Sequence, residues 1–219
     1  MARRTVWLCM VVALALLVPF RAFAVDWYTD RTAWQSAVGI WADVDIEGQV
    51  GDLEDFDAGS PLALPYSETL VFSNDLQGRQ VPDSWYGAWE GDPRVLWTRN
   101  MDGLVLGTFG GGGGGGVWAF ALEVSDTHYG LQETLVTLSD GATLTQEQLV
   151  TYPGEGGYAA FFGWVGGSTT WFEVDSTNHD LGMGRMMKAE APGAVPELPP
   201  FALAALGLLP LALKLRRKK

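Results

Sequence analysis

The chain has 219 residues, of which 47% are hydrophobic and 18% charged, and its formal net charge at pH 7 is −12. The imbalance is larger between Asp26 and Glu190, where 25 acidic residues face six basic ones. A surface of this charge repels the phosphates of nucleic acids and anionic lipid headgroups, so the composition excludes a nucleic-acid-binding protein.

The first 24 residues have the composition of a secretion signal. Two arginines precede an apolar run from Val6 to Phe20, and Ala22 and Ala24 form a small-residue cleavage site. We therefore expect cleavage after Ala24 and export of the rest. The single cysteine, Cys9, lies inside this signal, so the exported chain has neither a disulfide nor a thiolate metal site.

The exported body, 25–191, begins with a predicted helix from Asp30 to Gly39. Asp30 is a suitable N-cap, Gly39 is a suitable stop, and the apolar residues between them share one face. Nothing later in the body has a clear helical period.

The densest polar chemistry follows in the acidic segment 43–57, which reads D-V-D-I-E-G-Q-V-G-D-L-E-D-F-D. Asp43, Asp45, Glu47 and Glu54 occupy positions 1, 3, 5 and 12 of the EF-hand calcium loop. These four side chains form a candidate calcium site. No other cofactor is indicated.

The same segment supports a second and a third interpretation. D-V-D-I-E resembles the E-x-D-x-E strand of laminarinase-like glycosidases, which share a concanavalin-type sandwich. That resemblance implies a retaining mechanism with Asp43 as the nucleophile and Glu47 as the acid/base, although Asp43 is one methylene shorter than the family's glutamate. The third interpretation is a solvated acidic strand edge without chemistry.

The rest of the body predicts an all-β fold. Short alternating segments between Gly, Pro, Asp and Asn indicate about eight to ten strands, and hence an antiparallel β-sandwich of jelly-roll type. In the segment 117–124, one face is predicted to carry Trp118, Phe120, Leu122 and Val124. The strand candidates are 68–73, 94–98, 104–109, 117–124, 131–138, 141–151, 157–165 and 169–175.

Two segments of the body are predicted to be loops. Gly110 to Gly116 is an unbroken glycine run, and because a strand follows it rather than a Lys-containing helix start, it predicts a flexible loop and not a phosphate-binding one. Trp85 and Trp89 lie in a second predicted loop, where exposed rings could stack on sugar faces or cap the end of the sandwich. They are the candidates for glycan stacking.

The C-terminal residues divide into three parts. A linker, 192–200, contains Val195, Pro196 and Glu197, and an apolar stretch, 201–213, predicts a short transmembrane helix. A basic tail, 214–219, would stay on the cytoplasmic side and leave the body outside. Its basic residues are Lys214, Arg216, Arg217, Lys218 and Lys219.

These three parts resemble the PEP-CTERM sorting signal of Gram-negative bacteria, with Leu198 where that family has its second proline. The resemblance implies a precursor anchored in the inner membrane and facing the periplasm. It also implies processing near the Pro-Glu motif by an exosortase, a membrane transpeptidase-like enzyme. The product then reaches the cell surface or the medium, commonly in an exopolysaccharide or biofilm setting. The implied partners are the exosortase, the inner membrane during sorting, and extracellular polysaccharide.

The body is similar, more diffusely, to other proteins that carry this signal. The similarity lies in the D-R-T-A-W helix start, in the E-D-F-D segment at Glu54, and in F-F-G-W-V at Phe161. Such proteins ordinarily use the acidic segment as a structural strand, which favours the third interpretation of 43–57. We therefore expect a non-enzymatic exported protein. A glycan-binding module and a glycosidase are the alternatives.

Overall fold

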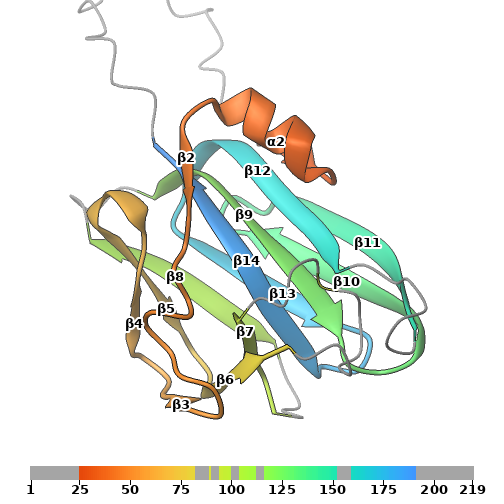
Figure 1. Cartoon of the computed structure of the whole chain (residues 1–219). Coiled ribbons are helices and arrows are strands. Elements are labelled where there is room, and N and C mark those ends of the chain that lie inside the picture. The colour runs from red at the N-terminus through yellow and green to blue at the C-terminus, as the bar shows by residue number, and fades with distance from the viewer. Residues whose placement is uncertain are drawn as a thin grey trace, which may run out of the picture. The chain divides into compact units, whose positions relative to one another are not determined.

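The computed structural model describes residues 25–81, 89, 94–99, 104–111, 116–151 and 159–190. Two antiparallel sheets and one helix make up this part of the chain (Figure 1). The predicted signal peptide with Ala22 and Ala24, the sorting motif, the apolar stretch and the basic tail lie outside the described residues. Within the described residues, no helix is long and apolar enough to cross a membrane.

The first sheet has eight strands in the order β1-β12-β9-β14-β7-β6-β3, and β2 also pairs with β14. Its strands are β1 (Asp26–Tyr28), β2 (Trp41–Asp43), β3 (Asp55–Phe56), β6 (Leu76–Gln80), β7 (Arg94–Trp97), β9 (Val117–Asp126), β12 (Ala160–Thr169) and β14 (Leu181–Ala189).

The second sheet has six strands in the order β11-β10-β13-β8-β5-β4. Its strands are β4 (Pro61–Ala63), β5 (Glu68–Phe72), β8 (Val105–Gly111), β10 (Gly130–Leu138), β11 (Thr143–Val150) and β13 (Trp171–Ser176). A short 3₁₀ turn, Pro65–Ser67, leads into β5.

The two sheets pack face to face over one hydrophobic core, which makes the fold an antiparallel β-sandwich. Phe120 and Trp164 enter the core from the first sheet, and Phe72 and Phe172 enter it from the second. The rings of Phe120 and Phe172 stack across the interface with centroids 5.9 Å apart. Burial of these large rings is the main source of stability.

The predicted helix is confirmed as α2 (Arg31–Val38). The Asp30 carboxylate accepts a hydrogen bond from the backbone N–H of Ala33 at 2.7 Å, and Gly39 ends the helix with φ +75°. The indole of Trp34 is fully buried and donates to the carbonyl of Trp164 at 3.1 Å. Gly163 makes this approach possible, because a Cβ there would lie 2.5 Å from the Trp34 ring. The helix therefore covers the outer face of the first sheet.

The predicted strands appear as β5 and β7 to β13, but five short strands and the central strand β14 lie outside the predicted set. The predicted alternation in β9 holds from Ala119 to Val124 and is wrong at Val117 and Trp118. Val117 belongs to the core between the sheets, whereas Trp118 joins the outer cluster beneath α2. The same end of β9 lies next to an irregularity in its pairing with β12, between Val165 and Thr169.

Candidate functional site

The central strand β14 changes partners along one of its edges. Residues Gly182–Gly184 pair with β7, and residues Met187–Ala189 pair with β2. Between them the register against β9 shifts, and Arg185 has φ +42°, in the left-handed region that non-glycine residues rarely adopt. At the bulge, β14 therefore passes from β7, its partner up to Gly184, to β2, its partner from Met187 (Figure 1).

An open groove of about 420 Å³ lies at this bulge. Helix α2, strand β2 with the turn after it, the start of β7 and the bulged part of β14 all contribute to its walls. The lining residues are Arg31, Gln35, Trp41, Asp43, Val44, Asp45, Ile46, Glu47, Arg94, Arg185, Met186 and Met187. We call it the arginine groove.

Three of the six basic residues between Asp26 and Glu190 line the arginine groove: Arg31, Arg94 and Arg185. The pairing of β7 with β14 ends at Val95 and Gly184, so Arg94 and Arg185 are the next residues on adjacent strands. Like charges placed side by side on neighbouring strands destabilise a sheet. Their gathering in such an acidic chain is therefore a specific feature of this site.

The guanidinium groups have unequal partners. Arg31 forms an ion pair with Glu123 of β9. Arg94 lies 3.3 Å from a carboxylate oxygen of Asp52, and the same oxygen accepts the backbone N–H of Gln80 at 2.7 Å. The Arg94 side chain is only 10% exposed, and its buried Nε and Nη1 make no hydrogen bond within the described residues. Among the described residues, Asp52 is thus the ion-pair partner of Arg94.

The acidic wall of the groove comes from the predicted segment. Asp43, Asp45 and Glu47 are exposed and line the groove, while Val44 and Ile46 between them are buried in the core. Three of the four predicted ligands therefore line one groove, because exposed and buried side chains alternate from the end of β2 into the turn that follows it. Glu54 does not line the groove.

The EF-hand arrangement is not formed by these residues. Asp43 belongs to strand β2, and Glu54 is followed by β3 instead of a helix. The Asp45 carboxylate accepts the N–H of Gly48 at 2.8 Å, and the Glu54 carboxylate accepts the N–H of Gly51 at 2.6 Å. Within the part of the chain that the structure describes, no three His, Cys, Asp or Glu side chains are grouped as metal ligands.

The strand that the laminarinase resemblance implies is also absent from the described segment after Asp43, where β2 ends. Glu47 lies in a turn, in which the N–H groups of Gln49 and Val50 both donate to the carbonyl of Ile46. Asp43 and Glu47 therefore do not lie on one face of a common strand, which is the arrangement that the resemblance implied.

The structure describes one of the two residues predicted to stack on glycans. Trp85 lies outside the described residues. Trp89 is only 8% exposed and packs with Val81 and Val95, so its ring is not open for glycan stacking, and of the two interpretations its burial favours a ring that covers the sandwich. Gly184 lies against its ring, since a Cβ at that position would be 2.9 Å from it.

The aromatic residue of the arginine groove is Trp41, which is half-buried at the start of β2. Sequence reasoning missed it, although it stands two residues before the acidic segment. The arginines carried no local signal, because positions 31, 94 and 185 are far apart in the sequence and meet only through the packing of α2, β7 and β14.

No protein-family model and no curated protein match this sequence. Among solved structures, the chain is similar to a mutant of a family 29 carbohydrate-binding module used to study ligand recognition. The identity is 10%, the match covers 68% of this chain and 90% of that one, and the TM-score is 0.29. At that score we derive neither the fold nor the function of this chain from the likeness.

Proposed function

We propose that the chain is an exported, non-enzymatic protein of the extracellular matrix whose β-sandwich body binds polysaccharide in the arginine groove. The observation that carries the proposal is the presence of Trp41, guanidinium groups and carboxylates in one groove. An indole offers an apolar face to the C–H surface of a sugar ring. Guanidinium groups donate to sugar oxygens and carboxylates accept from sugar hydroxyls, so both hydrogen-bonding roles of a hydroxyl are met.

The positions of the Asp43 and Glu47 carboxylates fit a site that binds a polysaccharide without hydrolysing it. Asp43 ends a strand and Glu47 lies in the following turn. Neither is placed as half of a nucleophile and acid pair on a common strand face. The same side chains serve well as hydrogen-bond acceptors in a binding site.

A glycan array tests the binding proposal. Wild-type protein is expected to bind extracellular bacterial oligosaccharides, and Trp41→Ala is expected to lose most of that binding while Trp41→Phe retains part of it. The matched control is Tyr129→Ala, which removes an aromatic ring that is 39% exposed and lies outside the groove. Equal binding by wild type and Trp41→Ala would contradict the proposal.

We also propose that an exosortase-type enzyme processes the C-terminal signal. The support is the order of the Pro-Glu motif, the apolar stretch and the basic residues up to Lys219. The intact mass of the protein exported by a host with an exosortase tests this step. We expect a mass that begins after Ala24 and lacks the basic tail; a mass that includes Lys219 would contradict it.

A further inference from the structure

We infer that two copies of this chain associate through strand β11, so that their second sheets join edge to edge into one continuous sheet. This association goes beyond the proposed polysaccharide binding and does not depend on it. Three features of β11 support it: its length at the edge of the sheet, its side chains, and the register in which it fits a second copy of itself.

Strand β11 is the long edge of the sandwich. The strands at the other three sheet edges, β1 and β3 in the first sheet and β4 in the second, have two or three residues each. Short edge strands protect a sheet against pairing with another chain. Strand β11 has eight residues in an unbroken register with β10, and no other described strand pairs with it (Figure 1). Its opposite edge is therefore long and regular enough for an added strand.

The side chains of β11 give this edge little protection. The segment 143–150 has one charged residue, Glu147, and neither lysine nor proline, the residues that commonly block pairing at edge strands. Leu149 is 59% exposed and lies opposite Leu131 of β10, which is 64% exposed. The two leucines form an apolar patch beside the edge, which an added strand would partly cover.

The first sheet holds β11 in place for such pairing. The side-chain amide of Gln146 donates a hydrogen bond to the carbonyl of Phe161 in β12. The neighbours of Gln146 in the strand, Thr145 and Glu147, are exposed on the outer face. Because the strand is already ordered, pairing with a second chain costs little further conformational entropy.

A second copy fits this edge because β11 is complementary to itself. In an antiparallel pair related by a two-fold axis, opposed residues must lie on the same face of the sheet. Two registers then overlap all but one residue of the strand, with the axis beside Gln146 or beside Glu147. The second would oppose two carboxylates, which destabilises a sheet. In the first, Glu147 lies opposite Thr145 of the second copy and Leu149 lies opposite Thr143, so the axis beside Gln146 is favoured.

This pairing ends at a dimer and leaves the arginine groove open. Both copies use the same edge, so the contact closes on itself. The groove is lined from α2, β2, β7, β14 and the turn after β2, and no residue of β11 lines it. A dimer would thus carry two grooves, which could bind one polysaccharide with avidity or hold two chains together.

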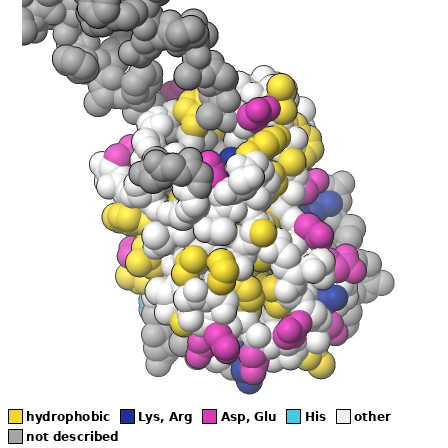
Figure 2. Space-filling view, turned by 90° about the vertical axis from the view of Figure 1, so that its left-hand side faces the viewer, with side chains coloured by type: hydrophobic (Ala, Val, Ile, Leu, Met, Phe, Trp, Pro, Cys, Tyr) yellow, Lys and Arg dark blue, Asp and Glu magenta, His cyan; other side chains and the backbone are white. Residues whose placement is uncertain are grey.

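Electrostatic repulsion opposes the association. Between Asp26 and Glu190, 25 acidic residues face six basic ones, and acidic side chains are spread over the face shown in Figure 2. Two copies of such a chain repel each other, and salt screens this repulsion. The dimer should therefore be weak in dilute buffer and form at lower protein concentration when salt is added.

Sedimentation equilibrium of the purified protein, from micromolar to millimolar concentration, tests the association. We expect monomers and dimers without larger species, and an association constant that rises with salt. Leu149→Lys should weaken the dimer about tenfold or more, because it places a charge at the edge. The matched control is Leu53→Lys, which adds the same charge at a residue that is 60% exposed in the turn before β3, and it should not weaken the dimer.

Disulfide formation tests the register, since the exported body has no cysteine of its own. In the double variant Thr145→Cys/Glu147→Cys, each new cysteine faces its counterpart on the second copy, so oxidation should give a covalent dimer. The single variant Glu147→Cys should cross-link far less. Equal cross-linking by the single and double variants would contradict the register.

Two other results would overturn the association itself. One is a monomer at every protein and salt concentration. The other is a dimer that Leu149→Lys does not weaken, because it would use a different surface. Neither result affects polysaccharide binding, which the glycan array measures separately.

Discussion

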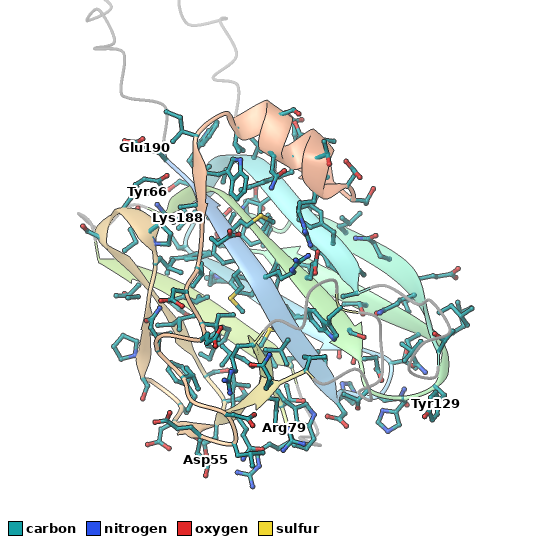
Figure 3. The ribbon with its side chains drawn as sticks, in the orientation of Figure 1. Asp55, Tyr66, Arg79, Tyr129, Lys188 and Glu190 are labelled. Atoms are coloured by element: carbon teal, nitrogen blue, oxygen red, sulfur yellow. The ribbon has the colours of Figure 1, made fainter. Side chains whose placement is uncertain are left out.

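The ammonium of Lys188 in β14 lies 2.8 Å from a carboxylate oxygen of Glu68 in β5, so an ion pair joins the two sheets of the sandwich. The Lys188 side chain is 4% exposed, and its Nζ also lies 4.7 Å from the ring centre of Tyr66 (Figure 3). A charge buried to this degree depends on its partners, because water no longer solvates it.

Removal of the Lys188 ammonium should therefore destabilise the protein. For Lys188→Ala we expect a loss of about 2–3 kcal/mol in the free energy of unfolding, measured by urea denaturation, since Glu68 keeps some exposure to water. The control is Arg99→Ala, whose pair with Asp55 is about half exposed on both sides and should contribute less than about 1 kcal/mol. If both variants lost the same free energy of unfolding, the ion pair between the sheets would contribute no more than the exposed pair, which would contradict the prediction.

The docking of α2 depends on Trp34. Trp34→Ala removes a fully buried ring and its hydrogen bond to Trp164, so the free energy of unfolding should fall by about 3–5 kcal/mol. Trp34→Phe keeps most of the ring and should cost less. Ser36→Ala, an exposed change on the same helix, should stay within about 0.5 kcal/mol of wild type. A Trp34→Ala protein as stable as Ser36→Ala would mean that the helix is not docked as described.

The burial of Trp89 can be tested through Gly184. A Cβ at position 184 would lie 2.8 Å from Val95 and 2.9 Å from the Trp89 ring, so Gly184→Ala should cost about 1–3 kcal/mol and shift tryptophan fluorescence to longer wavelength. Gly110→Ala is the control, because the new Cβ would meet only the Thr69 hydroxyl at 3.0 Å. An unchanged spectrum in Gly184→Ala would contradict the packing of Trp89.

Calcium should have no effect on stability through the acidic segment. Asp45 and Glu54 already accept backbone N–H groups within their own turns, and the four predicted ligands form no single cluster. We therefore expect the thermal midpoint to be the same with and without millimolar calcium, because an ion that binds the folded state would raise it. A rise of several degrees that disappears in Glu54→Gln would show that these residues bind the ion after all.

Local signals in the sequence predicted α2 well. Its N-cap at Asp30 and its stop at Gly39 act within a few residues, so no tertiary information was needed. The outward direction of Asp43, Asp45 and Glu47 is likewise visible as alternation with Val44 and Ile46. The jelly-roll connectivity and the sorting signal stay predictions.

Three other features depend on contacts between residues far apart in the sequence, and local patterns did not predict them. Strand β14 shows no alternation because eight of its nine residues are buried, with Arg185 the exception. Trp89 stands in a segment without periodicity, and among the described residues Val81, Val95, Ala159 and Gly184 pack near it. The arginine groove exists because β7 and β2 share one neighbouring strand, which no local pattern records.

The most direct test of the central claim is the location of bound polysaccharide, read by backbone hydrogen exchange. The protein is compared with and without a saturating amount of the oligosaccharide that binds best on the array. We expect slower exchange at Asp43–Glu47 and at Arg185–Met187, which line the arginine groove. Protection confined to β10 and β11 in the second sheet, with none in the groove, would contradict the account.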